Sequence, residues 1–183
     1  MFVLKLAIVL AALAPKPAAV PLTPEVAAKL QTIAFQAARD GDEQTLAEYF
    51  HAGRPVNEVN VRGDTLLTVA AYAGQSKTVA VILKQPNVAI DAKNKMGLTA
   101  LTAAAFKGHV DIAKDLVKAK ANANHANDRG QTAMMFAALA GKAEMVKFLI
   151  ASGADPKAKD RDGNTALSLA QQQGADDVVK LLK

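Results

Sequence analysis

The chain has 183 residues, a formal net charge of +5, and 51% hydrophobic but only 4% aromatic residues. This length is enough for one domain with a buried core. The absence of cysteine excludes disulfides, thiolate metal sites and cysteine nucleophiles. Because strands favour branched and aromatic side chains, the alanine-rich composition favours closely packed helices over a β-sandwich.

The first residues have the pattern of a secretory signal peptide. Lys5 precedes a nine-residue apolar run from Leu6 to Ala14, which fits the length of such a signal and is too short to span a bilayer. We expect residues 1–19 to direct export, with an uncleaved membrane anchor as the alternative. Residues 20–24 are expected to form an extended linker, because proline blocks helix formation.

A helix is expected to open the folded part of the chain. Thr23 precedes Pro24 and Glu25, and these residue types cap a helix, start it and complement its dipole. The helix is predicted to run to about Arg39 and to form the N-terminal cap of the repeats that follow.

Two series of glycines recur at a nearly constant period along the rest of the chain. The first series has spacings of 34, 33 and 33 residues, and the second has spacings of 33, 34, 33 and 33. A threonine and paired small residues follow the first series, and an apolar i, i+3, i+4, i+7 pattern follows the second. This period predicts stacked two-helix units with positive φ at the glycine between helices. The members are Gly63, Gly97, Gly130 and Gly163 in the first series and Gly41, Gly74, Gly108, Gly141 and Gly174 in the second.

These residues resemble the ankyrin repeat, whose pattern is roughly D-x-x-G-x-T-P-L-H-L-A-A-x-x-G-H followed by an apolar helix and G-A-D-V-N-A. The segments DRDGNTALSLA and SGADPKAKD come closest. The chain departs from the pattern because leucine or alanine replaces the proline, and Thr68, Thr102, Met135 and Ser168 replace the histidine of the turn. The threonine is still expected to cap the helix.

The resemblance implies an all-α fold, an ankyrin-repeat solenoid of about five helix-turn-helix units with projecting loops. We expect one domain over residues 25–183. Its repeats are expected at about 25–59, 60–93, 94–126, 127–159 and 160–183. The polar stretch QQQG suits a C-terminal cap, because terminal repeats need a polar outer face.

The sequence has no pattern typical of an enzyme. His109 follows Gly108, where the family pattern places a histidine that bonds within the turn. His51 and His125 have no acidic or serine partner at a diagnostic spacing, and no phosphate loop, metal-spaced histidine pair or nucleophile elbow is present. We therefore expect no enzyme activity, no catalytic residue, no cofactor and no metal.

Ankyrin proteins bind partners with their loop tips and inner helices, and the resemblance places the binding residues of this chain accordingly. An apolar row one unit apart is expected to face the partner, although these side chains could instead be partly buried packing residues. The predicted binding residues are Tyr72, Phe106, Lys107, Leu139, Arg62, Lys93, Lys95, Met96, Arg129, Lys159 and Arg161. Further expected loop-tip residues are Val61, Asp64, Leu98, Asp128, Gln131, Asp162 and Asn164.

The leading hypothesis is a monomeric protein-binding protein in the bacterial periplasm, with no nucleic-acid partner and no membrane span once the signal is removed. The resemblance to short bacterial ankyrin proteins with signal peptides suggests that it supports a co-exported enzyme, such as a catalase in oxidative-stress defence. The alternatives are an immunity protein that neutralises a secreted toxin enzyme, and a cytoplasmic or host-directed scaffold.

Overall fold

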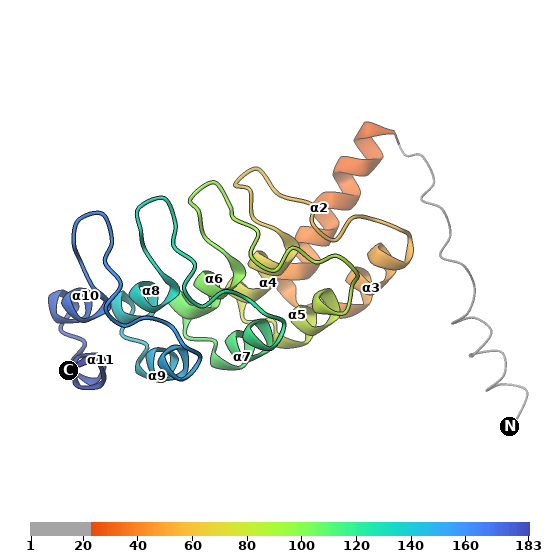
Figure 1. Cartoon of the computed structure of the whole chain (residues 1–183). Helices are drawn as coiled ribbons and strands as arrows, with labels where there is room; N and C mark the ends of the chain where they lie inside the picture. Colours follow the sequence, from red (N-terminus) through yellow and green to blue (C-terminus); the bar gives the residue numbers. More distant parts are fainter. Residues whose placement is uncertain (1–22) are drawn as a thin grey trace, which may run out of the picture.

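The computed structural model describes residues 23–183, which form ten helices arranged as five consecutive pairs (Figure 1). The all-α prediction is confirmed, since these residues form no strand and only two isolated bridges. The predicted signal peptide and residues 20–22 of the predicted linker lie outside the described residues. The pairs are α2 (Pro24–Asp40) with α3 (Glu43–His51), α4 (Leu66–Ala73) with α5 (Ser76–Leu83), α6 (Ala100–Lys107) with α7 (Val110–Lys118), α8 (Ala133–Leu139) with α9 (Ala143–Ala151), and α10 (Ala166–Gln173) with α11 (Asp176–Leu182).

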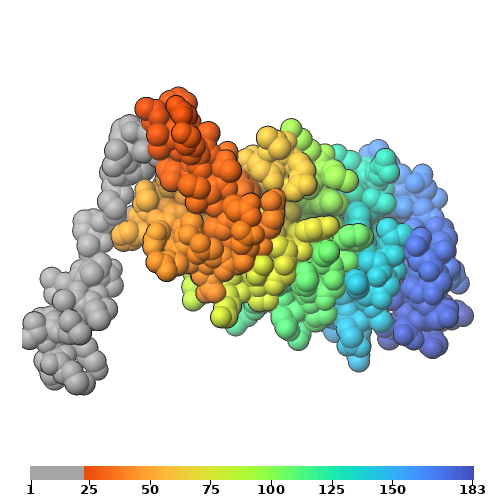
Figure 2. Space-filling view, turned by 180° about the vertical axis from the view of Figure 1, so that it is seen from behind, coloured from red at the N-terminus to blue at the C-terminus, as the bar shows by residue number. Residues whose placement is uncertain are grey.

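The helices form two layers. The inner helices α2, α4, α6, α8 and α10 pack successively against one another, and the outer helices pack beneath them (Figure 1). In the space-filling view the colours of successive units follow one another along the molecule without interleaving (Figure 2). Each unit therefore contacts only its neighbours, as in other repeat proteins.

Alanine makes the close approach of the inner helices possible. Ala70 and Ala71 in α4, and Ala104 and Ala105 in α6, have no exposed surface. Small side chains at these positions let neighbouring helices lie close together, while larger residues such as Leu101 fill the core between the layers. The recurring alanines of the sequence thus form the surface along which neighbouring units pack.

The predicted capping of helix ends by threonine is confirmed. Thr23 accepts a hydrogen bond from the Val26 amide, Pro24 starts α2, and the helix ends at Asp40, one residue beyond the expected end. Pro24, the last residue of the predicted linker, therefore belongs to the helix. The recurring threonines cap α4, α6, α8 and α10 in the same way, and a glycine with positive φ ends α2, α4, α6 and α10.

The connection after each of the first four outer helices also turns through one residue with positive φ. Gly53 and Gly153 take this conformation freely, and Asn87 tolerates it, but Lys120 adopts φ 73° with a full side chain. The left-handed conformation costs an ordinary L-residue roughly 1–2 kcal/mol. Lys120 is therefore a strained position on the surface of the stack.

Replacing Lys120 with glycine is expected to raise the free energy of unfolding by about 1 kcal/mol, because relief of the strain exceeds the added entropy of the unfolded chain. Urea denaturation followed by circular dichroism measures the change. Lys114→Gly, in the middle of α7, is the matched control and should lower stability by about 1 kcal/mol. A loss of stability in both variants would contradict the strain at Lys120.

Within residues 23–183, none of the helices has the length and apolar content needed to cross a bilayer.

Candidate partner-binding face

Four loops project from the helices, and each is fixed by one Asx side chain. We call residues 59–64, 93–98, 126–131 and 159–164 the fingers (Figure 1). In each finger the Oδ1 atom of the second residue accepts hydrogen bonds from the backbone amides two and four residues further along, at 2.7–3.0 Å. These residues are Asn60, Asn94, Asn127 and Asp160.

No role for these Asx residues was predicted from the sequence. They recur with the same period as the glycines and occupy the aspartate position of the D-x-x-G pattern. Asparagine and aspartate satisfy nearby backbone amides better than other residues, so this recurrence was the signal that could have found them. Each finger is consequently a fixed turn that carries exposed side chains at its tip.

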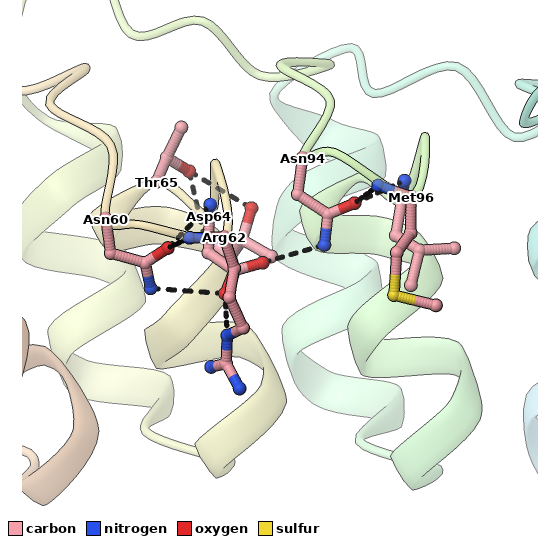
Figure 3. A network of polar contacts seen from close by, with 8 residues as sticks. Asn60, Arg62, Asp64, Thr65, Asn94 and Met96 are labelled. Atoms are coloured by element: carbon pink, nitrogen blue, oxygen red, sulfur yellow. Dashed lines mark hydrogen bonds and ion pairs between the residues drawn. The ribbon is translucent and has the colours of Figure 1, made fainter.

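Neighbouring fingers are joined in pairs. The Lys95 amide donates to the Arg62 carbonyl at 3.0 Å. Asn94 Nδ2 donates to Asp64 Oδ1 at 2.7 Å (Figure 3). The Arg161 amide donates to the Arg129 carbonyl at 2.8 Å in the last two fingers. Among the described residues, no such bond joins the second finger to the third.

The prediction that Asp64 is a loop-tip residue facing a partner is wrong. Its side chain is buried, with 7% of the residue exposed, and accepts hydrogen bonds from Asn60 Nδ2, Arg62 Nε and Asn94 Nδ2 at 3.2, 3.0 and 2.7 Å (Figure 3). Burial by itself would raise the pKa of this carboxyl. The hydrogen bonds from Asn94 and Asn60 and the charge of Arg62 outweigh it and hold the pKa below its usual value. Asp64 braces two fingers instead of facing a partner.

Asp64→Asn is expected to lower the free energy of unfolding by about 1–2 kcal/mol at pH 7, because one amide oxygen cannot replace two carboxylate oxygens. Because the folded pKa is depressed, this stabilisation is present above the unfolded pKa of about 4 and is lost as the pH falls through the folded value. The variant should therefore lose less stability than the wild type below pH 4.

Denaturant unfolding between pH 2 and 7 measures this dependence. Asp128→Asn is the control, since Asp128 is exposed and its carboxylate makes no hydrogen bond within residues 23–183. Equal effects of the two substitutions would contradict the bracing role of Asp64.

The predicted cations and the predicted methionine of the fingers lie at the surface. Met96 has 71% of its surface exposed. Arg62 forms an ion pair with Asp64, whereas none of the other finger cations belongs to a salt bridge among residues 23–183. Their part in binding stays a prediction. The exposed cations are Arg62, Lys93, Lys95, Arg129, Lys159 and Arg161.

The predicted apolar row lies on three adjacent inner helices. Tyr72, Phe106 and Leu139 occupy the last turns of α4, α6 and α8 and keep 51, 38 and 37% of their surface exposed. The same register holds Arg39 in α2 and Gln172 in α10, so the apolar stretch is confined to the three middle units. We call these three residues the central row; their side chains lie at the surface and not in the core.

The central row and the fingers share one face of the molecule. Gln172, in the register of the row, donates a hydrogen bond from Nε2 to Asn164 of the last finger at 3.4 Å. Lys107 reaches back across the row, with its Nζ 5.1 Å from the centre of the Tyr72 ring, which is a cation–π distance.

A recess of about 190 Å³ lies between α6 and α8. Its lining residues are Phe106, Lys107, Ala140 and Lys142. Lys142 was not among the predicted binding residues. It follows Gly141 and occupies the N-cap position of α9, without a capping hydrogen bond from its side chain. We call the central row together with Lys107 and Lys142 the palm.

His109 differs from the expectation. Its Nε2 atom is buried and has no hydrogen-bond partner among the described residues, so the predicted bond within the turn is absent. The ring instead packs over Gly74 of the preceding unit, where an added Cβ atom would lie 2.8 Å from Cε1. The histidine therefore fills space between units.

No group of three or more histidine, aspartate or glutamate side chains within residues 23–183 is arranged to hold a metal ion. The face described above offers apolar surface, a recess and unpaired cations. Such a surface can bind another molecule but contains no arranged nucleophile or acid–base pair.

Comparison with known proteins agrees with this architecture. The family profile for ankyrin repeats in three copies matches residues 34–127 and 116–183. Residues of this chain are 31% identical over 88 positions to alpha-latrocrustotoxin-Lt1a of Latrodectus tredecimguttatus, covering 48% of the chain and 6% of that protein. They are also 31% identical over 93 positions to ankyrin repeat and SOCS box protein 2 of Bos taurus, and likewise to that of Homo sapiens, covering 51% of the chain and 15% of each relative.

The fold defines a helical repeat scaffold, and the face with the fingers and the palm is suited to binding. The chain belongs to the ankyrin repeat family, because the family profile covers most of its length. Ankyrin repeats are in general protein–protein interaction modules without catalytic activity. The matched segments span only a small part of the relatives, so their own activities are not transferred to this chain.

Proposed function

We propose that this chain is an exported, monomeric binding protein that holds a partner protein against its palm and fingers. The observation that carries the proposal is the exposure of the central row. Three large apolar side chains lie in line on neighbouring helices, at a register where the flanking units place arginine and glutamine. Exposed large apolar side chains grouped on one face mark interaction sites, because covering them recovers about 25 cal/mol per Å² of apolar surface.

The fixed geometry of the fingers supports the same proposal. Their tips are held by Asx turns, so the backbone that carries the exposed side chains is already ordered before binding. Ordering in advance reduces the conformational entropy that association must overcome. A partner on the palm would also lie close to the fingers. Gln172, in the register of the central row, donates a hydrogen bond to Asn164 at the end of the last finger.

Changing Tyr72, Phe106 and Leu139 together to serine is expected to abolish co-purification of the partner that the tagged wild-type protein retains from a cell-envelope extract. The loss of buried apolar area at the centre of the interface should cost at least tenfold in affinity. Affinity purification followed by mass spectrometry identifies the partner, and titration of the purified pair measures the change.

The control triple variant replaces exposed apolar residues outside the central row. Ile33, Ile150 and Leu181 have comparable exposed fractions and lie on α2, α9 and α11. Changing these three to serine should leave the same partner bound. If the palm variant retained the partner while the control lost it, the assignment of the binding face would be wrong.

Export is the second part of the proposal, and it rests on the charged start and apolar run of residues 1–19. Supporting a co-exported enzyme such as a catalase is the role that we favour for the periplasm. Cell fractionation with determination of the mature N-terminus tests the location. Partner activity measured with and without the purified protein separates support from inhibition; an unshortened protein in the cytosol would overturn export.

A further inference from the structure

The two layers of the structure differ in charge. The fingers and palm carry eight exposed cations and only two exposed carboxylates, Asp128 and Asp162. The outer helices α3, α5, α7, α9 and α11 contain five lysines and seven carboxylates. The net positive charge of residues 23–183 is therefore concentrated on the face that also bears the central row.

Two of these cations line the recess beside an aromatic ring. Lys107 and Lys142 border the recess together with Phe106, and neither lysine belongs to a salt bridge within residues 23–183. A recess lined by Phe106 and Ala140 together with two ammonium groups fits an aliphatic or aromatic side chain followed by a carboxylate. Carboxylates are the protein groups that ammonium groups pair with most strongly.

The spacing of the central row adds a second requirement. Helices α4, α6 and α8 pack directly against one another, and packed helices lie about 8–10 Å apart. Tyr72, Phe106 and Leu139 share one register on these helices, so successive contacts on an occupant must repeat at about the same interval. An α-helix repeats one face at about 10 Å every seven residues.

A nucleic acid fits this face less well than a protein does. Leu139 and Met96 supply apolar surface without an aromatic ring on which a base could stack. The mixture of aliphatic surface and cations favours an acidic protein segment.

Building on the proposed function, we infer that the palm takes an acidic segment of the partner protein. Apolar side chains of the segment contact Tyr72, Phe106 and Leu139 at intervals of about 8–10 Å. Its carboxylates pair with Lys107 and Lys142 and with the cations of the fingers. The charges on this face thus select the partner and accelerate its approach, while the central row holds it.

Selection of a phage-displayed library of random 20-residue peptides against the full chain tests this inference. Enriched peptides are expected to be rich in aspartate and glutamate with spaced apolar residues. Their affinity should fall at least tenfold for the double variant Lys107→Glu and Lys142→Glu. The control double variant Lys118→Glu and Lys147→Glu changes exposed lysines on the outer helices of the same two units and should leave affinity unchanged.

The outcomes separate this inference from the proposed function. Enriched peptides that are not acidic, but that lose binding when the central row is changed to serine, would overturn the acidic occupant and leave the binding face in place. Peptides that bind the serine variant as well as the wild type would overturn both. Failure to enrich any peptide, or tighter binding of a labelled 20-nucleotide single-stranded DNA at about 150 mM salt, would also overturn the acidic segment.

Discussion

Gly97→Ala is expected to lower the free energy of unfolding by about 2–4 kcal/mol, although it adds only one methyl group. Gly97 has φ +73°, a conformation that strains any residue with a Cβ atom. The added Cβ would also lie 2.8 Å from Asn127 Cβ and 3.1 Å from Asn127 Cα. Because the obstacle includes the backbone of the next finger, the clash cannot be relieved by moving a flexible side chain.

Gly163→Ala provides the matched control at the equivalent position of the last finger. Gly163 has φ +80°, but no atom lies within 4 Å of its added Cβ. This substitution should cost only the backbone strain, about 1–2 kcal/mol. Urea denaturation followed by circular dichroism gives both values. Equal losses in the two variants would show that the close approach of neighbouring fingers does not limit residue choice at Gly97.

Leu149→Ala is expected to lower the free energy of unfolding by about 2–5 kcal/mol. Leu149 has no exposed surface and belongs to the hydrophobic core between the layers. Removing its side chain loses buried apolar area and leaves a cavity that the packed helices of two units cannot close.

The next residue in the same helix gives the control. Ile150 is 38% exposed, and Ile150→Ala should cost about 1 kcal/mol or less, because little buried contact is lost and alanine favours the helix. Thermal and urea unfolding of both variants checks the difference. If Ile150→Ala lost more unfolding free energy than Leu149→Ala, the side of α9 that carries Leu149 would not be the one that faces the core.

The fold could be predicted from the sequence because its repeating contacts leave a repeating pattern. The glycines at positive φ, the capping threonines and the alanines between helices recur in one phase, and each has a local physical requirement that few residues satisfy. The end of α2 could likewise be predicted to within one residue, because Gly41 fixes it.

The binding face was only partly predictable. The register of Tyr72, Phe106 and Leu139 follows from the repeat, so their exposure could be expected. A contact that occurs in only one pair of units leaves no such record in the sequence: Asp64 looks like any loop aspartate until Asn94 of the next finger is placed beside it. His109 was wrongly expected to bond within its own turn, because the family pattern does not show that its ring packs over the preceding unit.

The pairing of the fingers bears on how the face can adapt its shape. Hydrogen bonds tie the first finger to the second and the third to the fourth. Within residues 23–183, the second and third fingers instead meet through the packing of Gly97 against Asn127, and the Asn122 amide donates to Asp91 just ahead of them. Backbone hydrogen bonds resist sliding between adjacent segments, so the two fingers of each pair should move together. The boundary between the two pairs falls beside α6, the helix that carries Phe106 and Lys107, so a change in the spacing of the pairs would alter the face next to the palm.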